Sequence, residues 1–140
     1  MRFVDSNIFV YHLAADPRYG QQASNIVERI EAGEPAATST LVLIQVCSYL
    51  KAKRRHDAIP RFLAFIRSLP NLVKADTSMA DLLQAADLQA QHKLKWELWD
   101  DITIAAQMKR LNITEIYSND ADFDAIPGLK RIFQWSRTNG

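Results

Sequence analysis

The stretch D-D-I-T-I-A-A-Q-M-K-R-L-N-I-T-E-I-Y-S-N-D-A-D-F, residues 100–123, decides the fold of this chain. Its first half has the spacing of a buried helix, and residues 114–117 form a short run typical of a strand. One pair of carboxylates stands where the helix should begin, and a second pair follows the strand. Because ligands of open α/β sheets bind outside the carboxyl ends of the strands, we expect half of an active site in this stretch.

Short apolar strands alternate with helices along the rest of the sequence. We expect strands at 2–4, 36–39, 72–75, 114–117 and 130–133, with amphipathic or buried helices between them. This alternation predicts an α/β fold, a central, mostly parallel sheet covered by helices on both faces. At 140 residues the chain fits one domain, over residues 1–140, with a sizeable core.

Three of these elements carry more specific expectations. The strand at 36–39 is small and resembles an edge strand. The helix at 40–53 contains a stretch, residues 41–47, that is apolar all round except at Gln45, which predicts burial. A further helix should start at Thr77 or Ser78 and end near Lys93. Its expected inward face consists of Met79, Leu82, Leu83, Ala86 and Ala90.

Composition limits the classes of function. The formal net charge is +1, so any contact with nucleic acid depends on a local basic patch. One such run, Lys51 to Arg55, is expected either to contact RNA phosphates or to be a solvated helix end. Cys47 is the only cysteine, which excludes an internal disulfide. No apolar run reaches the ~18 residues that span a bilayer, so we expect no membrane contact and a cytoplasmic location.

Three aspartates at the ends of separate elements are the candidate site. Asp101 shares a helix face with core residues and should point inward, whereas Asp100, turned about 100° away, is the better N-cap. Asp5 ends the first strand and Asp120 follows the fourth. If these two strands are neighbours under the helix, Asp5, Asp101 and Asp120 converge. The alternative is that each aspartate is a helix or turn cap.

Charge repulsion indicates what such a cluster requires. Two carboxylates about 5 Å apart repel by roughly 3 kcal/mol at an effective dielectric of about 20. Three such pairs reach about 10 kcal/mol before solvent screening, comparable to a whole domain's stability of about 5–15 kcal/mol. Shared protons or a bound cation must offset this repulsion. Oxygen ligands without nearby His or Cys favour Mg²⁺ or Mn²⁺, which activate water and neutralise charge on a phosphate.

The motifs F-V-D-S-N-I-F-V-Y at 3–11, D-I-T-I-A-A at 101–106 and S-N-D-A-D-F at 118–123 resemble the PIN-domain family, particularly its VapC-like ribonuclease toxins. The resemblance spans nearly the whole chain. It implies an α/β/α sandwich, cleavage of RNA with Mg²⁺ or Mn²⁺, a homodimer, and a cognate antitoxin that covers the site.

The resemblance also assigns roles to residues. It implies that Asp5, Asp101 and Asp120 are metal-site acids, that Asp122 is a further acid, and that Ser6, Asn7 and Ser118 supply supporting hydrogen bonds. The family normally has a glutamate in the helix after the second strand, where this chain has Gln45. A neutral amide there can donate to Asp5 or Asp101, but it brings no charge. We therefore expect weaker metal binding than with a glutamate, unless Gln45 only serves helix packing.

These observations leave three functions. The first is a metal-dependent endoribonuclease of the toxin type, with Asp5, Asp101, Asp120, Asp122 and Gln45 at its site. The second is a catalytically weakened PIN-fold module that binds RNA or protein, which Gln45 favours. The third is a phosphoacceptor domain of the receiver type, but Asp76 and Lys130 are poorly placed for it.

Overall fold

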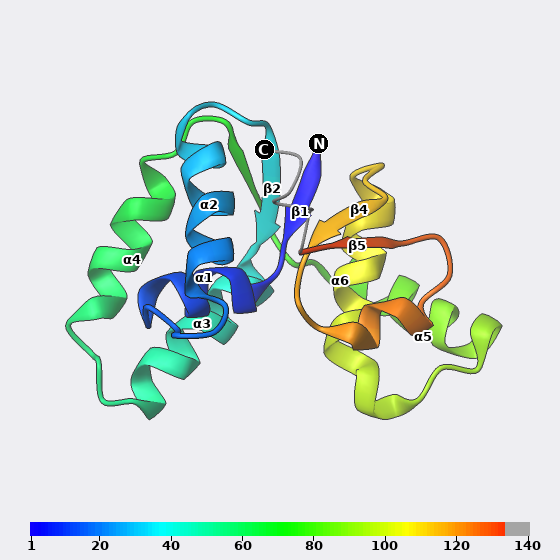
Figure 1. Cartoon of the computed structure of the whole chain (residues 1–140). Helices are drawn as coiled ribbons and strands as arrows, with labels where there is room; N and C mark the ends of the chain where they lie inside the picture. The colour runs from blue at the N-terminus through cyan, green and yellow to red at the C-terminus, as the bar shows by residue number, and fades with distance from the viewer. Residues whose placement is uncertain (134–140) are drawn as a thin grey trace.

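The structure, a computed structural model, describes residues 1–133. These residues form one five-stranded sheet in the order β3-β2-β1-β4-β5, and every neighbouring pair is parallel (Figure 1). The strands are β1 (Arg2–Val4), β2 (Ala36–Ser39), β3 (Leu72–Ala75), β4 (Glu115–Tyr117) and β5 (Lys130–Ile132). All five expected strands are therefore present, and the predicted parallel sheet is confirmed.

Helices flank this sheet on both sides. Those between β1 and β3 gather on one side, and those between β3 and β4 gather on the other (Figure 1). The first group is α1 (Ser6–Leu13), α2 (Gly20–Glu31), α3 (Thr40–Ala52) and α4 (Ala58–Arg67). The second group is α5 (Met79–His92), the 3₁₀ turn η1 (Trp96–Leu98) and α6 (Trp99–Arg110), and a second 3₁₀ turn, η2 (Ala121–Ala125), joins β4 to β5.

The strand order creates a switch point between β1 and β4. From β1 the chain moves outward through β2 to β3, then returns across the opposite face to β4 and continues to β5. Crossover connections between parallel strands are right-handed. Because the strand order runs outward in opposite directions from β1 and from β4, the two sets of helices lie on opposite faces of the sheet. The chain therefore leaves β1 and β4 toward opposite faces, and a crevice opens at their carboxyl ends.

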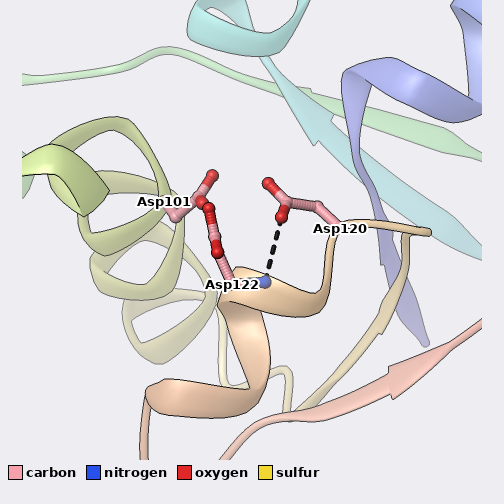
Figure 2. Close-up of side chains that lie close together, drawn as sticks. All are labelled: Asp101, Asp120 and Asp122. Atoms are coloured by element: carbon pink, nitrogen blue, oxygen red, sulfur yellow. Dashed lines mark hydrogen bonds between the residues drawn. The ribbon is translucent and has the colours of Figure 1, made fainter.

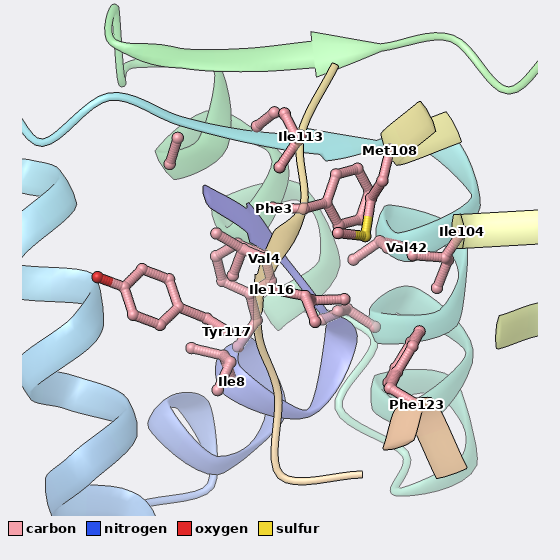
Figure 3. Packing of buried hydrophobic residues seen from close by; sticks show 14 of the residues in the cluster. Phe3, Val4, Ile8, Val42, Ile104, Met108, Ile113, Ile116, Tyr117 and Phe123 are labelled. Carbon is pink, nitrogen blue, oxygen red and sulfur yellow. The ribbon is translucent and has the colours of Figure 1, made fainter. Parts of the chain in front are cut away.

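Alternating side chains of β1 and β4 fill the core on both faces of the sheet. Phe3 pairs with Ile116 and Val4 with Tyr117, and all four are fully buried. Figure 3 shows Phe3 beside Met108 of α6, whereas Tyr117 points to the opposite side of the sheet. Successive residues of a strand face opposite sides, so this three-residue register fixes where Asp5 and Ser118 emerge.

Polar contacts hold α6 in register with α5. Arg110, in the last turn of α6, donates from Nε and Nη2 to the two carboxylate oxygens of Asp81 at 2.7 and 2.9 Å. Asp81 is buried at 2% exposure and also completes a capping box with Ser78. Gln107, fully buried, donates to the hydroxyl of Thr77. These contacts fix the far end of the helix whose first turn carries Asp101.

Three expectations about individual elements were wrong. The strand at 36–39 lies inside the sheet between β1 and β3 and is fully buried, because its small residues permit close packing from both faces. The apolar helix α3 is only partly covered, and its Ile44 is 62% exposed.

The inward face predicted for α5 is the outer face of the helix. Residues Met79, Leu82, Leu83, Ala86 and Ala90 are all exposed. The buried face instead consists of Asp81, Ala85 and Leu88. Neutralisation of Asp81 by Arg110 makes this burial tolerable, and the sequence pattern alone does not reveal that pairing. Within residues 1–133 no helix is long and apolar enough to cross a membrane.

Candidate metal centre

The three predicted aspartates come together at the switch point. Asp5 follows β1, Asp120 comes three residues after β4, and Asp101 lies in the first turn of α6. All three line one polar pocket, which also receives Asp122 from η2 and Gln45 from α3. Its complete lining is Asp5, Ser6, Asn7, Gln45, Glu97, Trp99, Asp100, Asp101, Asp120 and Asp122.

Three carboxylates stand closest to one another in this pocket. One oxygen of each of Asp101, Asp120 and Asp122 lies within 4.8 Å of the other two. Figure 2 shows Asp101 reaching from α6 toward Asp120 and Asp122, which approach from the turn after β4. The backbone N–H of Asp122 donates to Asp120 Oδ1 at 2.9 Å, so Asp120 caps the η2 turn while facing Asp101.

Asp5 is the buried floor of the pocket, at 4% exposure. Its Oδ1 accepts the backbone N–H of Ser6 at 2.8 Å, which makes Asp5 the N-cap of α1. Its Oδ2 accepts from Ser118 Oγ at 2.7 Å and from Asn7 Nδ2 at 3.2 Å. A carboxylate offers about four acceptor positions, so one remains for a ligand.

The motifs at 5–7 and 118–120 interlock through further hydrogen bonds. Asn7 Nδ2 also donates to Ser118 Oγ at 3.2 Å, and Asn7 Oδ1 accepts the backbone N–H of Asn119 at the same distance. Ser118 Oγ in turn accepts the backbone N–H of Asp120 at 3.0 Å. Because the two Asn7 bonds link the end of β1 to the end of β4 and the Ser118 bond holds Asp120, the loop carrying Asp120 is fixed relative to Asp5.

Burial and mutual repulsion perturb the carboxylates strongly. Desolvation, with the nearby charges of Asp120 and Asp5, raises the pKa of Asp101 to about 8. Burial also raises the pKa of Asp5, while hydrogen bonds from Ser118 and Ser6 oppose the rise. Without a cation, Asp101 is therefore mostly protonated at neutral pH, because its pKa lies above 7. The bound proton removes one of the negative charges that repel one another in the pocket.

The donor set fits a hard divalent cation. Carboxylate oxygens are the ligands that Mg²⁺ and Mn²⁺ prefer, and no His or Cys lines the pocket. Gln45 Oε1 adds an independent sign, because it is buried and has no hydrogen-bond partner within the described residues. This unpaired oxygen lies in the lining of the acidic pocket, where it could accept a hydrogen bond from a water molecule bound to the cation.

Gln45 reaches a different acid from those expected. Its Nε2 donates to Asp100 Oδ2 at 3.2 Å and not to Asp5 or Asp101. Asp100 is accordingly not an N-cap: α6 begins one residue earlier, at Trp99, and Leu98 before it makes no side-chain cap. The turn η1 runs directly into α6 and brings Asp100 within the first turn, facing α3.

Sequence reasoning missed two members of the site. Glu97 lines the pocket from η1. It stands four residues before Asp101, a spacing that places two residues on one helical face and was the available signal. Asn119 joins the loop to α1 through its backbone bond to Asn7 and through Nδ2, which donates to the Tyr11 hydroxyl at 3.3 Å.

The metal-free protein should lose stability as pH rises. The pKa of Asp101, about 8 in the fold, exceeds its value of about 3.9 in an unfolded chain. The folded state therefore binds more protons between these values, and the free energy of unfolding falls as pH rises through about 4 to 8. Asp101→Asn removes this loss, so in EDTA its melting temperature should exceed that of the wild type by a margin that grows toward pH 8.

Thermal melts in EDTA at pH 5, 6.5 and 8 test this expectation. Asp87→Asn, the same change at an exposed position of α5, is the matched control. Its melting temperature should change with pH in the same way as that of the wild type. Adding Mn²⁺ should raise the melting temperature of the wild type at pH 8 more than that of Asp101→Asn. A constant difference in melting temperature between the wild type and Asp101→Asn from pH 5 to pH 8 would contradict the raised pKa of Asp101.

Comparison with known proteins agrees with the geometry. The chain matches the family model of the PIN domain over residues 2–129. It is 31% identical over 134 residues to Ribonuclease VapC13 of Mycobacterium tuberculosis, an alignment that covers 94% of this chain and 99% of that protein.

Two solved structures share the fold. The first is VapC20 of M. tuberculosis, described as a toxin that cleaves the sarcin–ricin loop. Its TM-score is 0.74 at 23% identity, over 92% of this chain and 97% of that one. The second is VapBC2 of Rickettsia felis bound to a promoter DNA fragment, with a TM-score of 0.69 at 21% identity, over 94% and 96%. The resemblance inferred from the three acidic motifs is thus confirmed, and the chain belongs to the PIN-domain family.

Proposed function

We propose that this protein is a divalent-metal-dependent endoribonuclease that hydrolyses RNA phosphodiesters as the toxin of a toxin–antitoxin pair. The observation that supports it most is the trio Asp101, Asp120 and Asp122, gathered above a buried Asp5 in one pocket. Family membership and a relative named as a ribonuclease agree with it. A capping role alone does not explain why acids from three separate elements share one pocket.

The residues of the site have two roles: some would bind the ion, and others fix those ligands in place by hydrogen bonds. Asp101, Asp120 and Asp122, with the remaining acceptor position of Asp5, would hold Mg²⁺ or Mn²⁺. Such an ion supplies an activated water and neutralises charge that builds on the phosphate during in-line attack. Ser118 and Asn7 fix Asp5, and Asp120 is fixed by its own backbone bond to Ser118. Asp101 gives up its proton when the ion binds, since a ligating carboxylate must be ionised.

The alternative function is a PIN-fold module that binds without cutting. Gln45 favours it, because the amide carries no charge. The neighbouring Asp100 weakens this alternative, since it brings a carboxylate to the position that Gln45 contacts. The pocket therefore retains a high density of acids despite the amide, and we give precedence to catalysis.

Cleavage of labelled RNA separates the two functions. With Mn²⁺ or Mg²⁺ we expect the wild type to cut, and Asp101→Asn to lose about 10²-fold or more, the scale of removing a group that stabilises transition-state charge. Asp87→Asn should cut like the wild type, and EDTA should stop cleavage reversibly. Equal RNA binding by wild type and Asp101→Asn with no cleavage by either would instead support the binding module.

Gln45→Glu tests the effect of the amide. The change replaces the donor to Asp100 by a carboxylate, so the metal-free protein should become less stable and Mn²⁺ should bind more tightly with higher nuclease activity. Titration calorimetry with Mn²⁺ and melts in EDTA measure both effects. Gln45→Met, similar in volume but without charge or hydrogen bonds, is the control. Equal Mn²⁺ affinity of Gln45→Glu and the wild type would refute a role for position 45 in metal binding.

We also propose two protein partners. A cognate antitoxin is suggested by the solved VapBC complex that shares this fold, and a small reading frame adjacent to the gene would support it. A second copy of the chain is suggested by the exposed face of α5. On that face Met79 is 67% exposed, Leu83 59% and Leu82 38%. Adjacent apolar side chains of this size on a helix commonly mark an interface.

Light scattering with size-exclusion chromatography measures the assembly. We expect the wild type to elute as a dimer and Leu83→Glu as a folded monomer, because a charge cannot be buried at an apolar interface without a partner. Leu63→Glu makes the same change on α4, at another exposed leucine outside the exposed face of α5, and should leave the mass unchanged. A dimer that persists in Leu83→Glu would place the interface elsewhere.

A further inference from the structure

A short segment with two tryptophans leads directly into the acidic pocket. Residues 93–99, K-L-K-W-E-L-W, run from the end of α5 to the first residue of α6. Lys93 adopts a left-handed conformation with φ of 52° and ends α5, which redirects the chain sharply. Leu94 is buried and Leu98 packs against the core, so the segment is anchored at two points. The side chains between these anchors have no part in core packing.

The two indoles form a pair at the rim of the pocket. Trp99 is half-buried and lines the pocket beside Asp100, whereas Trp96 is 62% exposed. Their ring centroids lie 5.8 Å apart with planes inclined by 40°. Trp96 is thus in contact with Trp99 and still leaves much of its indole open to solvent. An exposed tryptophan held by a second one offers a rigid aromatic surface next to the carboxylates.

Two exposed cations, Lys93 and Lys95, precede Trp96 in the same segment. Neither lysine forms an ion pair within residues 1–133. The pocket itself is strongly acidic and repels a phosphate backbone until a cation binds. A polyanionic substrate therefore needs attraction from outside the pocket. Lysines beside an exposed indole provide it, because they attract phosphates while the indole accepts a base.

We propose that Trp96, in contact with Trp99 and preceded in the chain by Lys93 and Lys95, is a stacking site for an unpaired nucleotide of the RNA substrate, next to the phosphate that is cut. The proposal rests on the proposed ribonuclease function and adds that the substrate is single-stranded at this point. In a duplex the base faces are covered by their neighbours, so only an unpaired base can lie on the indole.

Binding without cleavage tests the site directly. The probe is a fluorescein-labelled single-stranded RNA of mixed sequence, about ten nucleotides long, since comparable stacking channels span about 4–16 nucleotides. Anisotropy is measured in EDTA, where no cutting can occur. Trp96→Ala and Trp96→Leu should weaken binding by about 5- to 100-fold, the range that corresponds to known base-stacking energies, whereas Trp96→Tyr should retain most of it. The matching blunt duplex should bind more weakly than the single strand.

Two further measurements separate stacking from other roles of Trp96. RNA should quench tryptophan fluorescence in the wild type, and the quench should shrink in Trp96→Leu. Lys95→Ala should flatten the salt dependence of binding without changing the preference for single strands. The proposal would be overturned if Trp96→Leu bound RNA as tightly as the wild type. It would also be overturned if light scattering showed that Trp96→Leu changes only subunit assembly.

Kinetics with Mn²⁺ distinguish failure of this site from failure of the nuclease function. If the proposal holds, Trp96→Ala raises KM for single-stranded RNA with little change in kcat, whereas Asp101→Asn loses kcat. Cleavage by Trp96→Ala with an unchanged KM overturns the stacking site and leaves the nuclease intact. Weaker RNA binding by Trp96→Leu in EDTA supports the stacking site even when no variant cleaves.

Discussion

Carboxylates that repel one another must be held together, and the rest of this structure depends on that requirement. At an effective dielectric of about 20, each close pair opposes folding by roughly 3 kcal/mol before screening. The fold resists this through bonds made at the ends of two adjacent strands: Ser118 and Asn7 both donate to Asp5, and Ser118 also accepts from the backbone of Asp120. Neutral donors surround Asp5, so its position does not depend on a cation.

The third member of the cluster is positioned from a distance. Asp101 belongs to α6, whose interior residues 102–108 are all buried between the sheet and neighbouring elements. The opposite end of α6 is tied to α5 by Arg110 and the buried Asp81. Because the helix is rigid and its register is fixed at its far end, its first turn is delivered to the switch point between β1 and β4. Packing thus balances the repulsion, and burial of Asp101 together with the remaining repulsion from Asp120 and Asp5 raises the pKa of Asp101.

Much of this arrangement could be predicted from the sequence, for reasons specific to the residues. Strand ends coincide with abrupt changes from apolar to acidic residues at Asp5 and around Asp120, and parallel strands bring such ends to one edge. Helical spacing places Asp101 on the face of Ile104 and Met108. Other features depend on partners distant in sequence. Apolar spacing alone does not predict the buried face of α5, because that face contains Asp81, whose burial depends on its ion pair with Arg110. The bond from Gln45 to Asp100 likewise required knowing that η1 continues into α6.

The order of residues leading into α6 addresses a conflict that acidic nucleases face in general. Carboxylates that attract a divalent cation repel the phosphates on which it acts, so attraction for the substrate must come from other groups close by. Along residues 93–101 the chain presents two lysines, then two tryptophans with Glu97 between them, and then Asp100 and Asp101. Anchoring at Leu94 and Leu98 keeps that order in space, because neither end of the segment can turn away from the core. The proposed cation site and the proposed RNA-stacking site would therefore occupy consecutive parts of one segment.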